Sequence, residues 1–144
     1  MRTLYFARLD EQLRLAPAVS VSLLRQLGEA CPRRSSAQQS ELVTDIDRFI
    51  EARSWTDLAL GLVRLELPTW QTRRIACEGG EWICSLSRQP HLPLSLDETA
   101  DGLHSDLPLA TLRALIEALR INEAAPELPA HVGAQQRPLA DFPP

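Results

Sequence analysis

Residues 70–88 read WQTRRIACEGGEWICSLSR, and this stretch predicts a β-hairpin. Two half-apolar runs flank Gly79 and Gly80, and glycine tolerates the positive φ angles of a two-residue hairpin turn. Counting outward from this turn places Glu78 opposite Glu81. The same count predicts the further pairs Cys77–Trp82, Ala76–Ile83, Ile75–Cys84, Arg74–Ser85, Arg73–Leu86, Thr72–Ser87 and Gln71–Arg88.

This register sorts the hairpin side chains onto two faces, because successive residues of a strand point to opposite sides. The apolar face would hold Ile75, Cys77, Trp82, Cys84 and Leu86. The opposite face is mostly polar, although Ala76 and Ile83 fall on it. Since an isolated hairpin is marginally stable in water, we expect helices to cover the apolar face.

Apolar residues at helical spacing predict four helices over residues 3–15, 17–30, 40–53 and 55–66. Asp106 is expected to cap a fifth helix, with Pro108 in its first turn. The expected buried stripe of that helix is Leu109, Leu112, Leu115, Ile116 and Leu119. Between the hairpin and the fifth helix, Ser95 and Glu98 have the spacing of a capping box and predict one or two helical turns.

The expected fold class is α+β, with four to five helices packed on one face of a small antiparallel sheet built around the hairpin. A further short strand is expected near residues 65–67 or 92–96. Residues 1–121 are expected to form a single domain. Residues 122–144 are rich in proline and alanine and poor in large apolar residues, which predicts a disordered tail.

The composition narrows the classes of function. The formal net charge of −4 argues against nucleic-acid binding, which needs a basic surface. All 15 basic residues are arginine, which excludes chemistry that depends on lysine. The first fifteen residues are interrupted by charges, and no apolar run is long enough to span a bilayer, so we expect neither a signal peptide nor membrane insertion. With three cysteines in the chain, a reducing cytoplasmic location is the simplest expectation.

The cysteines are expected to be structural. Cys77 and Cys84 share the apolar face on a diagonal, and diagonal neighbours lie roughly 7–8 Å apart, beyond easy disulfide reach. His91 and His104 follow in the sequence and raise the alternative of a Cys–His nucleophile, but buried thiols are usually inert. Cys31 is expected to be a semi-exposed thiol. The spacing of these residues fits no metal motif, so we expect no catalytic residue, no metal site and no cofactor.

The open end of the hairpin carries the candidate ligand-binding residues. Arg73 and Arg88 share the apolar face in the predicted register, and their guanidinium groups could hold a carboxylate or phosphate. The remaining residues expected around this pocket are Gln71, His91 and Trp70. The alternative is internal pairing of the arginines with the acidic side chains Asp97, Glu98 and Asp101, or with Glu66. The alternation of a basic hairpin and an acidic segment favours internal pairing.

Three stretches carry a family resemblance: LELPTWQTRRI (65–75), GGEWICSLSRQ (79–89) and DLPLATLRALIEA (106–118). Together they resemble a family of small proteins of unknown function from high-GC proteobacteria, over about half of the chain. The resemblance implies a bacterial cytoplasmic protein. It transfers no activity and no functional residue.

Two functions follow from these observations. The first is a non-catalytic interaction or regulatory module, which forms a homodimer or binds another protein. Its basis is a surplus of apolar residues that need cover: Leu92, Leu94, Leu96 and Leu103, with Ala76 and Ile83 on the outer hairpin face. The alternative is a binder of small anionic ligands, or a minor enzyme, with its pocket at the arginine end of the hairpin.

Overall fold

The computed structural model describes residues 2–30 and 37–124. Over these residues the chain has the predicted α+β fold, with an open, three-stranded antiparallel sheet of order β1-β2-β3. The elements are α1 (Arg2–Leu15), α2 (Val21–Ala30), α3 (Ala37–Ala52), α4 (Trp55–Glu66), β1 (Gln71–Glu78), β2 (Glu81–Ser87), the short 3-10 helix η1 (Leu94–Leu96), β3 (Ala100–His104) and α5 (Leu107–Ala124). Cys31 and most of the expected tail lie outside the described residues.

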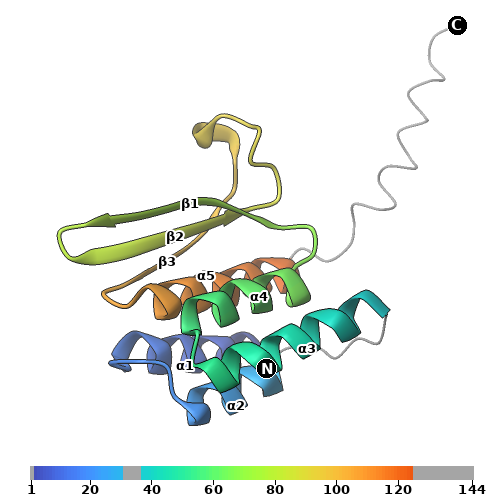
Figure 1. Ribbon diagram of the computed structural model, residues 1–144. Coiled ribbons are helices and arrows are strands. Elements are labelled where there is room, and N and C mark those ends of the chain that lie inside the picture. Colours follow the sequence, from blue (N-terminus) through green and yellow to red (C-terminus); the bar gives the residue numbers. More distant parts are fainter. Residues whose placement is uncertain (1, 31–36, 125–144) are drawn as a thin grey trace, which may run out of the picture.

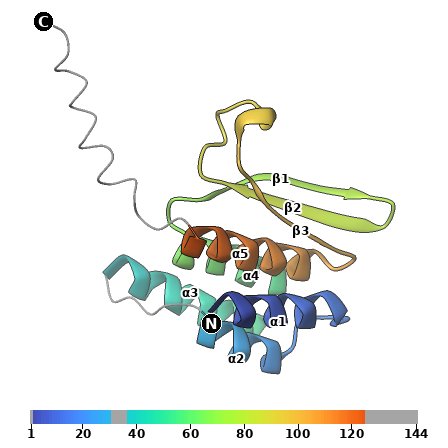
Figure 2. The same cartoon turned by 180° about the vertical axis from the view of Figure 1, so that it is seen from behind.

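The elements form three layers (Figure 1). The sheet is the first layer, α4 and α5 form the second, and α1, α2 and α3 form the third, as the view from behind in Figure 2 also shows. Helix α5 packs against β2 and β3 on one side and against α1 and α4 on others. Its buried residues therefore exceed the predicted stripe: Leu109, Ala110, Thr111, Leu112, Ala114, Leu115, Ile116, Ala118, Leu119 and Ile121. The core is centred on α5, and the hairpin lies at its edge.

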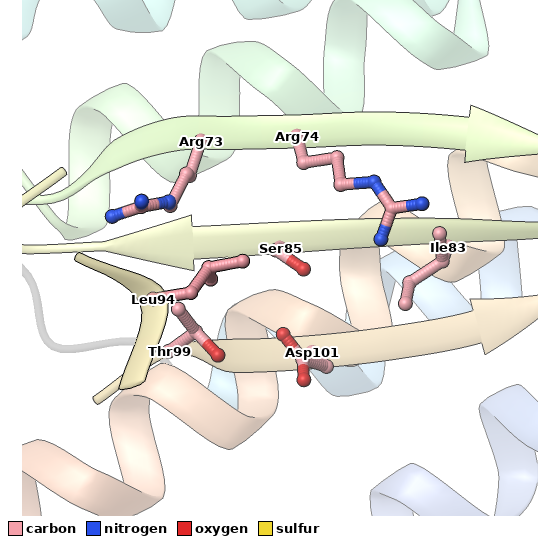
Figure 3. A pocket seen from close by; sticks show the side chains of 7 residues that line it. All are labelled: Arg73, Arg74, Ile83, Ser85, Leu94, Thr99 and Asp101. Carbon is pink, nitrogen blue, oxygen red and sulfur yellow. The ribbon is translucent and has the colours of Figure 1, made fainter. Parts of the chain in front are cut away.

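The predicted hairpin turn and most of its register are confirmed. Gly79 and Gly80 have φ angles of 61° and 81°, and the pairs from Glu78–Glu81 to Arg74–Ser85 are those predicted. Beyond Arg74 the register is wrong by one residue, because a β-bulge between Thr72 and Arg74 leaves Arg73 unpaired. The observed outer pairs are Thr72–Leu86 and Gln71–Ser87, in place of Arg73–Leu86, Thr72–Ser87 and Gln71–Arg88. The bulge also turns Arg73 to the outer face of the sheet, beside Arg74, and away from the apolar face where we expected it (Figure 3).

The third strand, β3, lies outside both ranges in which we expected one. It pairs with β2 on the side opposite β1, with Gly102 across from Cys84. Ala100, Gly102 and His104 are buried towards α5, whereas the two residues between them face outward. The acidic segment of residues 89–106 therefore contributes a strand to the sheet, and β2 becomes its central strand.

Strand β1 extends past the helical layers. Of the described elements, only β2 packs extensively against it. Ile75 points to the same side as Cys84, yet it is 38% exposed, and Cys77 is exposed as well. The helices therefore cover the predicted apolar face under β2 and β3 only, and β1 remains exposed on both sides.

The helix ends follow local capping signals to different degrees. Helix α4 has the predicted bounds, although Ser54 makes no side-chain capping hydrogen bond. Helix α2 begins four residues after Pro17, where the backbone N–H of Leu23 donates to Ser20 Oγ over 3.2 Å. Asp106 caps α5 as expected, because it accepts the N–H of Leu109 at 3.3 Å, and α5 continues to Ala124, beyond the expected domain end at residue 121. None of the described helices is long and apolar enough to cross a bilayer.

Candidate functional site

The structure pairs Arg73 with a carboxylate of its own chain. Arg73 Nη1 lies 2.6 Å from Asp97 Oδ2, and the Asp97 side chain is only 2% exposed. Ser87 Oγ lies within 2.8 Å of both Asp97 oxygens and accepts the backbone N–H of Gln89 at 2.9 Å. This network fastens the segment before β3 onto the end of the sheet. Internal pairing, the alternative favoured by the charge balance, is thus the observed arrangement for Arg73.

The other four predicted ligand-binding residues do not form a pocket with Arg73. Trp70 is buried, and the Arg88 guanidinium stacks over its ring at 5.0 Å from the centroid. Arg88 also pairs with Glu98 at 3.6 Å on the surface. Gln71 and His91 are exposed. The structure brings only Arg88 and Trp70 together, because the bulge sends Arg73 to the opposite face.

A different surface stands out on the outer side of the sheet. The five α-helices of the described chain all lie on the other side, so no α-helix covers this face (Figures 1 and 2). The strand register aligns its side chains in two rows that cross all three strands. We call these six residues the open face: the polar row Arg74, Ser85 and Asp101, and the apolar row Ala76, Ile83 and Leu103.

The segment before β3 stands over one end of the open face and leaves a hollow of about 250 Å³ (Figure 3). Its lining residues are Arg73, Arg74, Ile83, Ser85, Leu94, Thr99 and Asp101. Arg74 is exposed and pairs at 3.3 Å with Glu78, which is more exposed still, while Asp101 has no ion-pair partner within the described residues. Ser85 lacks a histidine among these lining residues that could activate it, so the hollow has the groups for polar contacts but no nucleophile–base pair.

Large apolar side chains project from the same side of the molecule. Leu94 is 64% exposed, and Leu103 is 43% exposed in the apolar row. Leu96 follows on η1 and is also exposed. The sequence predicted that these residues need cover, but their grouping with Ala76 and Ile83 depends on β3, which the sequence did not predict. A partly exposed apolar row beside a polar row is typical of a protein–protein contact surface.

Cys84 and His104 do not form a reactive pair. Cys84 is fully buried, and this burial raises the pKa of its thiol, although a hydrogen bond with Thr111 acts in the opposite direction. His104 has both ring nitrogens engaged by backbone groups: Asp106 N–H donates to Nδ1 and Nε2 donates to the Ala16 carbonyl, each over 2.9 Å. His104 therefore joins the end of β3 to the residue after α1, and its nitrogens are not available to activate a thiol. No cluster of three or more potential metal ligands occurs within residues 2–30 and 37–124.

The two cysteines that the structure describes should differ sharply in reactivity. In the native protein at neutral pH we expect iodoacetamide to alkylate Cys77 within minutes and to leave Cys84 unmodified until the chain is unfolded. The reason is that Cys77 is exposed, while Cys84 is buried with a raised thiol pKa that suppresses the reactive thiolate. Peptide mass spectrometry of native and denatured samples measures both sites. Rapid labelling of Cys84 in the native protein would contradict the burial of its side chain.

Comparison with known proteins found no matching family model, no matching curated protein and no matching solved structure. The resemblance to proteobacterial proteins stays a prediction.

Proposed function

We propose that the protein is a non-catalytic interaction module of the bacterial cytoplasm that binds another protein chain, a second copy of itself included, through the uncovered side of its sheet. The observation that carries this proposal is the three-stranded sheet with all five described α-helices on one side and, on the other, exposed Leu103 and Leu94 beside half-buried Ile83. A sheet with one solvated face normally presents polar side chains there. The apolar row on this face is what a partner would cover.

The anionic-ligand alternative has less support. Its central residue, Arg73, already pairs with a buried carboxylate, and Arg88 pairs with Glu98 and stacks on Trp70. A ligand would have to displace these internal partners. The hollow on the open face is lined by Asp101 as well as by Arg74. The negative charge of Asp101 repels simple anions and so opposes their binding there.

The surface can be tested with substitutions that leave the core intact. The double variant Leu94→Ser/Leu103→Thr removes two exposed apolar side chains of this side, and threonine retains strand propensity. A few residues at the centre of an interface carry most of the binding energy, at about 2 kcal/mol or more each. We place Leu94 and Leu103 among them, and we therefore expect the variant to bind its partner at least about tenfold more weakly. The readouts are light scattering for self-association and quantitative capture of partner chains from extract of the native host.

The matched control is Leu4→Ser/Leu15→Ser, which removes two leucines of α1 that are each 65% exposed. This control should bind as the wild type does, and circular dichroism should show both variants folded. Equal binding by the wild type and the Leu94→Ser/Leu103→Thr variant, with both monomeric at high concentration, would show that the open face is not the binding surface.

A further inference from the structure

The outer edge of β1 is free to form hydrogen bonds. Glu78 and Glu81 flank a two-residue turn, so they exchange both of their backbone hydrogen bonds. Since the direction of bonding alternates along a strand, the N–H and C=O groups of Ile75 and Cys77 point away from β2. No loop of the described chain donates to or accepts from them. The segment from Arg74 to Glu78 therefore presents an unpaired strand edge, of the kind that binds another strand.

The side chains of this edge complement a second copy of the same strand. When two copies of β1 pair antiparallel, residues whose backbone groups point outward, such as Ile75 and Cys77, must lie opposite outward-pointing residues of the other copy. The two-fold axis that relates the copies must then pass through the position of a residue and not between two residues. We call that residue the centre of the pairing. A centre at Arg74 places that arginine opposite itself, and centres at Ile75 or Cys77 leave both charged residues opposite uncharged ones. A centre at Ala76 places Arg74 opposite Glu78 of the second copy, and Glu78 opposite Arg74. Opposite charges across neighbouring strands stabilise their pairing, and like charges destabilise it.

Three further features fit the centre at Ala76. It places Ile75 opposite Cys77, two exposed residues that point to the same side of the sheet. It places Ala76 opposite itself in a pair without mutual hydrogen bonds, where the Cα atoms come within about 4.5 Å and a small side chain fits. The bulge at Arg73 and the turn at Gly79 then limit the ladder to the five residues between them.

We propose that β1 pairs with β1 of a second copy of this chain, antiparallel and centred on Ala76, with reciprocal Arg74–Glu78 ion pairs between the copies. These pairs replace the exposed ion pair that the same two residues form within one chain, which contributes little to stability. This inference rests on the proposed function and specifies its partner and register. The two sheets join into one sheet of six strands, three from each copy. The two-fold axis is perpendicular to this sheet, so both open faces lie on the same side and form one extended surface.

Exchange of charges between two chains tests the pairing. Arg74→Glu and Glu78→Arg each create two like-charge contacts in a homodimer, and we expect each variant alone to dimerise at least about tenfold more weakly than the wild type. An equal mixture of the two variants restores both opposite-charge contacts in the heterodimer, so we expect it to dimerise as the wild type does. Light scattering and native mass spectrometry measure the two species. Effects of the substitutions on folding are not reversed by mixing, so recovery in the mixture reports contact between chains.

A disulfide tests the register. In a chain with Cys31→Ser and Cys77→Ser, we expect Ala76→Cys to form a disulfide-linked dimer under mild oxidation, because the two introduced thiols meet at the two-fold axis. The control Thr72→Cys, on the same strand and outside the paired segment, should stay unlinked.

Two results would overturn the inference. The first is a wild-type protein that is monomeric at all accessible concentrations. The second is a wild-type dimer for which mixing the two charge variants restores no dimer and Ala76→Cys forms no disulfide-linked dimer. If the wild type is monomeric while Leu94→Ser/Leu103→Thr still abolishes capture of a different protein, self-pairing is excluded and the proposed interaction function stands.

Discussion

Gly102→Ala is expected to be the most damaging small substitution in the described chain. The added Cβ would lie 2.1 Å from the carbonyl oxygen of Ala110 and 2.5 Å from the backbone nitrogen of Ala114. Both atoms belong to the backbone of α5, which is packed on several sides and cannot move aside without disturbing the whole core. We expect a loss of about 3 kcal/mol or more in the free energy of unfolding, at the upper end of the cost of overpacking. Urea denaturation followed by tryptophan fluorescence and circular dichroism measures it.

The same substitution at another glycine provides the control. Gly28 lies in α2, and a Cβ added there would meet no atom within 4 Å. Alanine has the higher helix propensity, so Gly28→Ala should stabilise the protein by about 0.5–1 kcal/mol. The two Gly→Ala variants should therefore change stability in opposite directions. A Gly102→Ala protein as stable as the wild type would mean that β3 does not lie directly on α5.

The position of Gly102 also explains why β3 could not be predicted from the sequence. A half-buried strand is recognised by apolar residues on alternate positions. In ADGLH the buried positions are Ala100, Gly102 and His104, and the only large apolar residue, Leu103, points outward. The close approach of α5 requires small residues at this contact, and that requirement removes the apolar alternation. The sequence of residues 100–104 therefore predicts no strand.

The same contact explains the incomplete prediction for α5. Its leucine stripe follows helical periodicity and was predicted correctly, because large apolar residues at that spacing indicate a buried face. Ala110, Ala114 and Ala118 form a second buried face with a four-residue repeat. Alanine is common on exposed helix faces too, so this repeat does not by itself indicate contact with a sheet. Only the pairing of β3 with β2 brings the two surfaces together.

The hairpin shows how far local signals reach. The Gly79–Gly80 turn determines the register for as long as the pairing is regular, and the prediction is right for the five residue pairs nearest the turn, from Glu78–Glu81 to Arg74–Ser85. The bulge at Arg73 has no such signal, because the residue carries no feature that distinguishes it from Arg74. Its cause lies in the tertiary structure, where the buried Asp97 carboxylate attracts the Arg73 side chain to the outer face. The structure places Arg73 apart from the other residues of the predicted site and pairs it with the acidic segment, which is the alternative that the charge pattern favours.

Arg73→Met is the second substitution for which we expect a large effect. It removes the cation beside Asp97, whose side chain is 2% exposed, and leaves a buried carboxylate supported only by Ser87. Breaking a buried ion pair from one side commonly costs about 3–5 kcal/mol, and because Arg73 is itself 19% exposed we expect the lower end of that range. Arg88→Met is the matched control. Its ion pair with Glu98 is at the surface, and methionine can replace the stacking on Trp70 by a sulfur–aromatic contact, so we expect a change within about 1 kcal/mol.

A second substitution separates a structural role of Arg73 from a ligand-binding role. Asp97→Asn removes the negative charge and keeps an oxygen that accepts from Ser87, so the double variant Arg73→Met/Asp97→Asn should be more stable than Arg73→Met alone. Such recovery arises only if the damage in the single variant comes from the uncompensated carboxylate. A ligand-binding role of Arg73 predicts a different result. The Arg73→Met protein would then have wild-type stability, but phosphate or carboxylate ligands would no longer stabilise it. Thermal unfolding of the four proteins of this cycle, with and without such anions, distinguishes the two roles.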